Sequence, residues 1–117
     1  LLGVPYLWGG RTPAGLDCSA LVQLLLAEQG VVLPRDARDQ HRACSQLGRT
    51  ERSRVGDLAC FARPGERVSH IGLCTGGSTY LHARGWVRLA SLDPHNALYD
   101  KELSVQFRGW VRPPSAR

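Results

Sequence analysis

The sequence lacks the features that mark a membrane-spanning or newly exported chain. No apolar run approaches the ~18 residues that a membrane span needs, and the longest, around Leu24 to Ala27, is far too short. The chain begins at Leu1 rather than at methionine, and it carries no basic segment followed by an apolar one. Its 117 residues make one ordinary domain, residues 1–117, which we expect to be excised from a longer protein.

Lysine is scarce, and this scarcity shapes the charge. Lys101 is the only lysine, so that fourteen of the fifteen basic residues are arginines, and the formal net charge is +5. A basic chain invites a nucleic-acid interpretation. The arginines are, however, scattered between acidic residues and apolar strands, and the densest group, from Arg49 to Arg54, contains Glu51. We therefore expect no nucleic-acid partner and predict an anionic substrate or surface instead.

Closely spaced cysteine pairs are also absent. Cys18, Cys44, Cys60 and Cys74 lie 26, 16 and 14 residues apart, and without a Cys-x-x-Cys pair no structural zinc site is expected. Two disulfides are arithmetically possible, but a domain of this size has enough core without them. We interpret Cys60 and Cys74, which stand in apolar runs, as small buried side chains.

The first half of the chain predicts helices. Residues Leu1 to Gly15 are rich in glycine, proline and aromatic residues and predict a loop. Asp17 is a suitable N-cap for a helix from about Cys18 to Gln29, and Gly30 is a natural stop. Apolar residues cover most of the circumference of this helix, so we expect it to be largely buried. They are Leu21, Val22, Leu24, Leu25 and Leu26. A second, more polar helix is predicted from Pro34 to about Ala43.

The second half of the chain predicts an antiparallel meander. Short apolar runs are separated by the turn signals Pro64-Gly65, Gly76-Gly77 and Gly85. The predicted strands are Asp57–Phe61, Ser69–Thr75, Thr79–Ala83, Trp86–Ala90 and Val105–Val111. Helices followed by such a meander make an α+β domain.

Cys18 is the candidate nucleophile. It falls in the first turn of the predicted helix, directly after Asp17. A helix N-terminus stabilises negative charge through its free N–H groups and its dipole, which favours a thiolate, and the same N–H groups can hold an oxyanion. A small buried residue at a helix start is the simpler interpretation, and position alone does not decide between the two.

Two of the four histidines lie on neighbouring predicted strands. His70 stands within V-S-H-I-G-L and His82 within Y-L-H-A-R, so one can act as a base and the other can orient it. For His70, a buried core histidine is the alternative. His41 lies in a polar helix and His95 in a loop, and we interpret both as solvated.

The two histidines share one face of the sheet only under a condition. If Gly76-Gly77 formed a simple two-residue turn, His70 would face Ala83, and His82 would point to the other side. We therefore predict an odd residue count or a bulge in this connection.

Five motifs stand in an order and spacing that resemble a known family. They are P-Y-L-W-G-G-x-x-x-x-G-x-D-C-S-A-L-V-Q at Pro5 to Gln23, L-P-R-D-A-R-D-Q at Leu33 to Gln40, V-G-D-L at Val55 to Leu58, S-H-I-G-L at Ser69 to Leu73 and Y-L-H-A at Tyr80 to Ala83. Together they cover nearly the whole chain and resemble the NlpC/P60 family of cell-wall cysteine peptidases. The resemblance implies a papain-like fold, in which the nucleophile helix packs on a twisted antiparallel sheet.

The resemblance also implies catalytic roles. It implies that Cys18 is the nucleophile, that His70 is the base and that His82 orients His70. Tyr6 matches a tyrosine that lies over the thiol in this family and helps to shape the oxyanion site. The bond cut is expected to lie in the peptidoglycan stem peptide, most often between γ-D-glutamate and a diamino acid.

Substrate-binding residues are implied by the branch of the family that trims free cell-wall peptides. Asp17 and Ser19 are expected to help bind the amino end and the glutamate carboxylate, and Trp8 and Ser69 are further candidates. That branch often has a serine in the second helix where this chain has Arg38, which can itself pair with a carboxylate. Members of the branch carry SH3-like domains ahead of the catalytic domain, so such domains are expected in the parent chain.

One position departs from the family pattern. Ala20 stands where a glycine usually follows Cys-Ser, and one methyl group on a helix is a mild change.

We therefore predict a cysteine peptidase that needs neither a metal nor an organic cofactor. His70 takes the proton of Cys18, and the thiolate attacks the carbonyl of γ-D-glutamate. Two alternatives stay open: a catalytically idle cell-wall binding module of the same fold, and a related amidase or acyltransferase with the same Cys–His pair. The expected location is bacterial, cytoplasmic for a recycling enzyme and otherwise periplasmic or associated with the cell wall. The sequence does not predict which diamino acid is used.

Overall fold

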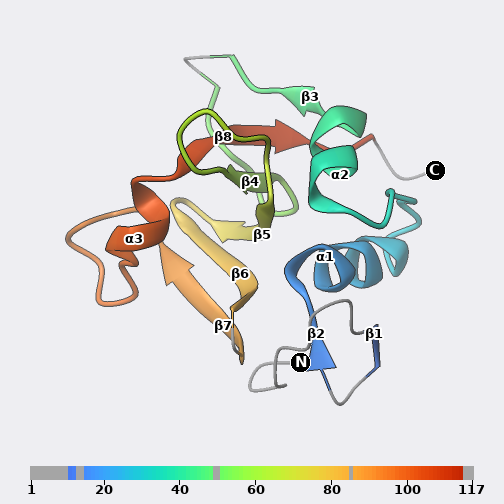
Figure 1. The fold of residues 1–117 in the computed structure, drawn as a ribbon, viewed down its shortest axis with the longest axis horizontal. Helices are drawn as coiled ribbons and strands as arrows, with labels where there is room; N and C mark the ends of the chain where they lie inside the picture. Colours follow the sequence, from blue (N-terminus) through green and yellow to red (C-terminus); the bar gives the residue numbers. More distant parts are fainter. Residues whose placement is uncertain (1–10, 13–14, 49–50, 85, 115–117) are drawn as a thin grey trace.

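The apolar runs of the second half of the chain pair into one antiparallel sheet, and the helices of the first half pack on it (Figure 1). The computed structural model describes residues 11–12, 15–48, 51–84 and 86–114. The described helices are α1 (Cys18–Ala27), α2 (Ala37–Ala43) and α3 (Lys101–Ser104). The described strands are β1 (Arg11–Thr12), β2 (Gly15–Leu16), β3 (Ser45–Gln46), β4 (Leu58–Phe61), β5 (His70–Gly76), β6 (Thr79–Arg84), β7 (Trp86–Ser91) and β8 (Phe107–Arg112).

The main sheet has six strands in the order β3-β8-β4-β5-β6-β7, and every neighbouring pair is antiparallel. Strands β4 to β7 form the predicted meander. The last strand, β8, returns across the sheet and pairs between β3 and β4, which places the end of the chain beside its middle. The α+β class is therefore confirmed.

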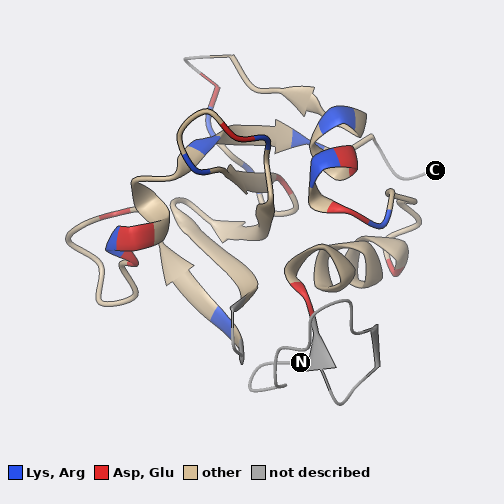
Figure 2. Ribbon diagram, in the orientation of Figure 1, with Lys and Arg blue, Asp and Glu red and all other residues tan. Residues whose placement is uncertain are grey.

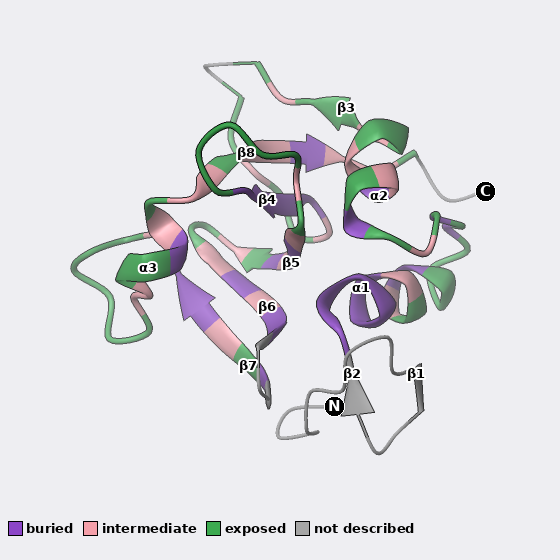
Figure 3. Cartoon of the chain, viewed as in Figure 1, coloured by how far each residue is buried: buried purple, intermediate pink, exposed green. Residues whose placement is uncertain are grey.

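Helix α1 begins where the sequence predicts. The side chain of Asp17 accepts a hydrogen bond from the backbone N–H of Ala20 at 2.8 Å, which makes it the N-cap. The helix ends at Ala27, and Gly30, at φ 78°, turns the chain so that Val31 N–H bonds the carbonyl of Leu26. The helix is largely buried, as predicted, with Leu21, Val22 and Leu26 among its buried residues, although Leu24 is 42% exposed. The helix lies on a sheet, so only one side of it is covered (Figure 3).

Three other local predictions need correction. Helix α2 begins at Ala37 rather than at Pro34, because Asp36 is still extended and takes the N-cap position. Within the predicted opening loop, Arg11–Thr12 pairs with Gly15–Leu16, while residues 1–10 lie outside the described part. The short elements β3 and α3 were not predicted, because neither has the length to show a period.

The two faces of the sheet carry separate parts of the core. On one face, α1 and α2 cover side chains such as Leu58, Cys60 and Ile71. On the opposite face, Leu103 of α3 packs against a cluster that includes Phe61 and Tyr80. The four cysteines are all free; Cys18, Cys60 and Cys74 are buried and Cys44 is half-buried, which confirms the interpretation of Cys60 and Cys74. None of the described helices is long and apolar enough to cross a membrane.

A β-bulge interrupts the β5–β6 hairpin, as predicted. Cys74 pairs with Tyr80 and Gly76 pairs with Thr79, so Thr75 has no partner in β6. The turn itself consists of Gly77 and Ser78 rather than Gly76 and Gly77. Because Thr75 is an extra residue, the side chains of β5 before the bulge face the opposite side of the sheet from where a regular hairpin would place them relative to β6.

At Gly72 in β5, the neighbouring strand leaves no room for a side chain. A Cβ atom there would lie 2.7 Å from Cδ2 of Tyr80 and 3.3 Å from the carbonyl oxygen of Leu81. Because Tyr80 is fully buried, its ring has no room to move away. We expect Gly72→Ala to lower the free energy of unfolding by about 1–3 kcal/mol, as overpacking does. Urea denaturation measures this change.

The matched control is Gly48→Ala, where the nearest atom to an added Cβ is 3.5 Å away. It should change the free energy of unfolding by about 0.5 kcal/mol or less. Equal stability of the two variants would contradict the close approach of Tyr80.

Candidate active site

Cys18 is the first residue of α1 and lies under the start of β5. Its side chain is 6% exposed and belongs to the core cluster that contains Ile71. The backbone N–H of Ile71 bonds the sulfur and lowers the pKa of the thiol, as do the backbone N–H groups of Ser19 and of Cys18 itself. The sulfur therefore meets β5 one residue from His70.

Burial nevertheless dominates the ionisation of this thiol. Desolvation raises the pKa of Cys18 to about 11, and the negative charge of Asp17 adds to the rise. The N–H groups at the helix start lower the pKa of Cys18 in the predicted direction, but burial outweighs them. The thiol is neutral near pH 7 and needs a base to become a nucleophile.

His70 and His82 form a hydrogen-bonded pair. Nε2 of His70 lies 2.9 Å from Nδ1 of His82, and the two rings are nearly perpendicular, at 89°. The bulge at Thr75 makes this possible: Cys74 faces Tyr80, so two-residue steps along each strand place His70 and His82 on the same side. His82 is fully buried, with the ring of Tyr80 against it.

The thiol and the histidine pair come from different faces of the sheet. His70 pairs with Phe61 and contacts its ring, on the face that α3 covers, whereas Cys18 packs with Ile71 on the face that α1 covers. His70 is the first residue of β5, so it lies at the margin of the sheet, where the strand begins and the two faces are no longer separated. The candidate site therefore lies at the end of the strand rather than within the sheet.

Asp17 and Ser19 are held together by Arg35. Nη1 of Arg35 donates to Oδ1 of Asp17 at 3.0 Å and to Oγ of Ser19 at 2.9 Å, and Nη2 donates to Oδ2 of Asp17 at 2.7 Å. Asp17 and Ser19 are both buried. The sequence analysis missed Arg35, although it stands in the motif L-P-R-D, because a partner 18 residues away shows no local pattern.

Gln40 is a second residue that the sequence analysis missed. It is fully buried, and its Nε2 donates to the carbonyls of Ser19 and of Pro34, each at 2.8 Å. These bonds tie α2 to the first turn of α1 and so fix the backbone that follows Cys18. Ala20, where the family pattern has glycine, packs in a small core cluster with Ala83 and Val87.

The other predicted substrate-binding residues are more dispersed. Ser69 is exposed, and its backbone N–H bonds the carbonyl of Phe61 at 3.1 Å. Arg38 is exposed on α2, 3.8 Å from a carboxylate oxygen of Asp39, and lines a pocket rather than the Asp17–Arg35 cluster. Tyr6 and Trp8 lie outside the described residues.

Within the described part of the chain, no cluster of three or more histidine, cysteine or acidic side chains has an arrangement that could hold a metal ion. The motif V-G-D-L instead has a structural use. Asp57 is buried and accepts two hydrogen bonds from Arg112, at 3.0 and 2.9 Å, and one from the backbone N–H of Arg54. These bonds fasten β8 to the loop before β4.

Comparison with known proteins gives a consistent match. The model of the NlpC/P60 family matches residues 3–108. The gamma-D-glutamyl-L-lysine dipeptidyl-peptidase of Bacillus subtilis is 35% identical over 92% of this chain and 37% of its own length. The bifunctional muramidase/DL-endopeptidase of the same organism is 42% identical over 63% of this chain and 23% of its own length. The chain thus spans well under half the length of these relatives.

A solved structure shares the fold. The crystal structure of an NlpC/P60 family protein from Bacillus cereus superposes with a TM-score of 0.82, at 26% identity, over 96% of this chain and 36% of that one. The chain therefore shares the fold of that protein, with a helix packed on an antiparallel sheet.

The ionisation of Cys18 can be measured by iodoacetamide labelling. Because the pKa is raised to about 11, the thiolate fraction should grow about tenfold for each pH unit between pH 7 and pH 10, without a plateau. Mass mapping of the labelled peptide gives the rate at each pH. Asp17→Asn should shift the curve to lower pH, because the charge of Asp17 raises the pKa.

The urea-unfolded chain is the control and should label Cys18 with an ordinary thiol pKa of about 8.5. A labelling rate in the folded protein that is already constant below pH 8 would contradict a neutral resting thiol.

The contribution of Arg35 can be tested by Arg35→Gln. The change leaves the buried carboxylate of Asp17 without its bidentate partner, so we expect the free energy of unfolding to fall by about 1–3 kcal/mol. Arg88→Gln, at an exposed position of β7, is the control and should cost about 0.5 kcal/mol or less. Urea denaturation compares the two, and equal stabilities would show that the Arg35–Asp17 pair is dispensable.

Proposed function

The chain belongs to the NlpC/P60 family, and from this premise we propose that it is a cysteine peptidase that hydrolyses peptidoglycan stem peptides at the bond between γ-D-glutamate and a diamino acid. Two relatives support a peptidase by their names, and one of those names specifies a γ-D-glutamyl bond. Because the chain spans only part of these relatives, we propose that residues 1–117 are the catalytic domain of a longer protein. SH3-like domains ahead of it would complete the binding of the substrate's amino end.

The observation that carries this proposal is the hydrogen bond between His70 and His82 at the end of the strand that the Cys18 sulfur touches. A neutral, buried thiol needs a base, and His70 is the titratable side chain one residue from the backbone N–H that bonds the sulfur. Nε2 of His70 is directed at His82, so Nδ1 is the ring nitrogen assigned to the thiol proton. A decayed binding module would have no need of this pair.

The proposed reaction has two halves. First, Nδ1 of His70 accepts the thiol proton, the Cys18 sulfur bonds the γ-carbonyl carbon of glutamate, and the C–N bond breaks as His70 returns the proton to the leaving amine. Then His70 takes a proton from water, whose oxygen attacks the thioester carbon. The C–S bond breaks, the γ-carboxylate leaves, and the sulfur regains a proton.

Two further groups take part in the proposal. The N–H groups at the start of α1 are proposed to stabilise the oxyanion, with Tyr6 proposed beside them. His82 acts through His70: by accepting from the Nε2–H of His70, it would select the tautomer that leaves Nδ1 able to take a proton. The Asp17–Ser19–Arg35 cluster is proposed to bind the charged end of the acyl part of the substrate.

Three variants test the assigned roles on the tripeptide L-Ala-γ-D-Glu-diamino acid. Cys18→Ala should abolish release of the diamino acid, and His70→Ala should lower kcat by about a thousandfold or more. His82→Ala should lower kcat by about ten- to a hundredfold with little change in KM, because it removes orientation rather than the base. Product masses after hydrolysis in 18O-water should show the label in the γ-carboxylate of glutamate.

Matched controls and contradicting results are available. Cys44→Ala and His95→Gln remove the same chemical groups elsewhere in the fold and should keep kcat within about twofold. Hydrolysis that survives Cys18→Ala, or cleavage at another bond, would overturn the proposal. Transfer of the acyl group to an added amine instead of water would indicate an acyltransferase, and binding without cleavage an idle module.

A further inference from the structure

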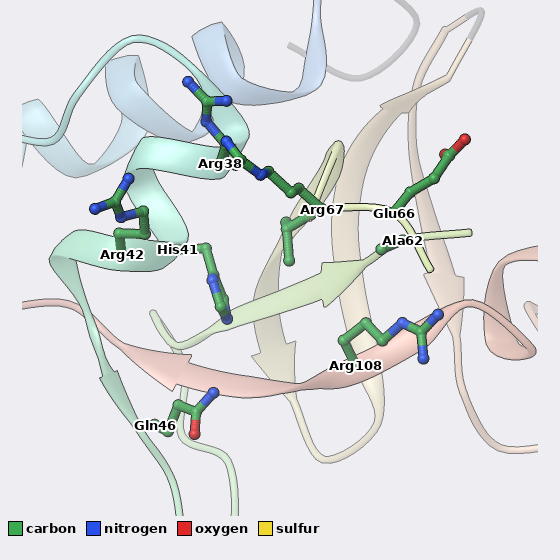
Figure 4. Close-up of a pocket in the computed structure, with 9 residues that line it drawn as sticks. Arg38, His41, Arg42, Gln46, Ala62, Glu66, Arg67 and Arg108 are labelled. Atoms are coloured by element: carbon green, nitrogen blue, oxygen red, sulfur yellow. The ribbon is translucent and has the colours of Figure 1, made fainter. Parts of the chain in front are cut away.

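Gln40 is the polar side chain of α2 that points into the fold. It is fully buried, and Ala37 is the other buried residue of this helix. The basic side chains of α2, Arg38, His41 and Arg42, instead line an open pocket of about 590 Å³ (Figure 4). Burying an amide costs free energy unless it is hydrogen-bonded, so the position of Gln40 has to be understood from the bonds that it makes.

One of these bonds holds a peptide group in the first turn of α1. Nε2 of Gln40 donates to the carbonyl of Ser19 at 2.8 Å, and the N–H of the same peptide group, that of Ala20, donates to Oδ1 of Asp17 at 2.8 Å. Arg35 in turn holds the carboxylate of Asp17 with both of its terminal nitrogens. Both polar ends of this peptide group are therefore fixed by side chains.

A second bond closes these contacts into a ring. Nε2 of Gln40 also donates to the carbonyl of Pro34 at 2.8 Å, and Pro34 directly precedes Arg35 in the chain. The contacts therefore run from the amide through the first turn of α1 to Asp17 and Arg35, and return along the backbone to their start. We refer to them as the first-turn ring. Because each bond restrains its neighbours, the first turn of α1 cannot tilt without breaking at least one of them.

The first turn of α1 also carries the groups that act on the thiol. The backbone N–H groups of Cys18 and Ser19 bond the sulfur of Cys18 and lower its pKa, against the burial that raises it. The N–H groups at this helix start are also the proposed oxyanion donors. Such donors are effective only when their direction is fixed before the reaction begins, and the first-turn ring fixes the turn that contains them.

We propose that Gln40 is a positioning residue of the Cys18 site, whose amide holds the first turn of α1 so that its N–H groups point at the reacting sulfur and carbonyl. Gln40 acts through the backbone of Ser19 and exchanges no proton with the substrate. The proposal rests on the proposed function and adds a residue whose loss lowers the rate of reaction rather than the affinity for substrate.

Gln23 provides a matched control for the loss of an amide. It lies on α1, its Nε2 donates to the carbonyl of Leu33 at 3.0 Å, and, like Gln40, it has a buried Oε1 that accepts no hydrogen bond from a described residue. Its side chain therefore ties α1 to the same connecting segment, but it does not hold the peptide group between Ser19 and Ala20. Gln40→Met and Gln23→Met remove the same neutral group, and only the first opens the ring.

Iodoacetamide labelling of Cys18 tests the ring without any substrate. In the full-length protein at pH 9, Gln40→Met should slow labelling about threefold or more, because weaker N–H contacts raise the pKa of the thiol by about 0.5. Both substitutions are neutral, so the charges of Asp17, Arg35 and the histidine pair are unchanged. Gln23→Met should label Cys18 at the rate of the unaltered protein.

A second variant opens the ring at another side chain. Arg35→Lys keeps a positive charge beside Asp17 but removes the bidentate contact, and the Arg35 side chain is 28% exposed, so the fold should accept the change. It should slow labelling in the same direction as Gln40→Met, and it decides the question if Gln40→Met does not fold. Urea denaturation checks that each variant is folded under the labelling conditions. Unchanged or faster labelling in the ring variants, or equal slowing by Gln23→Met, would overturn the proposal.

Turnover of the tripeptide L-Ala-γ-D-Glu-diamino acid gives a readout that a merely structural role would not move. Per folded protein, Gln40→Met should lower kcat about ten- to a hundredfold and leave KM within about twofold, because misdirected N–H groups stabilise the transition state less than they affect the bound substrate. Gln23→Met should keep both constants within about twofold.

The two assays separate this proposal from the proposed function. Cleavage by the unaltered protein together with an unchanged kcat in Gln40→Met would leave the peptidase and overturn the role of Gln40. A parallel rise of KM would assign Gln40 to substrate binding and overturn its positioning role. Absence of cleavage by the unaltered protein would overturn the proposed function, and the labelling rates would still decide whether the ring directs the N–H groups at the sulfur.

Discussion

A single unpaired residue in the β5–β6 hairpin decides what the sheet can place beside Cys18. Without the bulge at Thr75, every side chain of β6 would change faces, and His82 would point toward α1 instead of toward His70. The bulge acts together with Gly72, whose missing side chain admits the ring of Tyr80, and that ring in turn packs against His82. The histidine pair therefore depends on backbone geometry and close packing.

Burial of the thiol and the pairing of the histidines are two parts of one arrangement. The N–H groups around the Cys18 sulfur lower its pKa, but desolvation and the charge of Asp17 raise it further. Arg35 limits the second effect, because it holds the carboxylate of Asp17 in a bidentate pair. A nucleophile that rests as a neutral thiol is protected from oxidation and adventitious alkylation, since the thiolate is the reactive form. The cost is that its activation depends on a correctly oriented base.

The features that the sequence predicted correctly are those that depend on residues close together in the chain. Asp17 caps its own helix, Gly30 ends it, and strand parity alone required an irregular connection between His70 and His82. The parts that it missed depend on distant partners. Arg35 and Gln40 act on residues 18 and 21 positions away, and no period or cap marks them. The burial that raises the pKa of Cys18 also depends on distant residues, because its core cluster includes side chains of β4, β5 and β8.

The arginines that supply most of the positive charge fall into two groups, those in ion pairs and those exposed to solvent. Two arginines are held by bidentate ion pairs, Arg35 with Asp17 and Arg112 with Asp57, and each pair joins segments that are distant in the sequence. Arg42, Arg67 and Arg108, which have no ion pair with a described residue, line one pocket from α2, the β4–β5 loop and β8. Figure 2 shows the basic positions along the ribbon of these segments. Like charges gathered in this way repel one another and add nothing to folding stability. Exposed arginines outside the pocket, such as Arg54 and Arg63, have no ion pair with a described residue either, so an unpaired guanidinium group is the ordinary state of a solvated arginine on this surface.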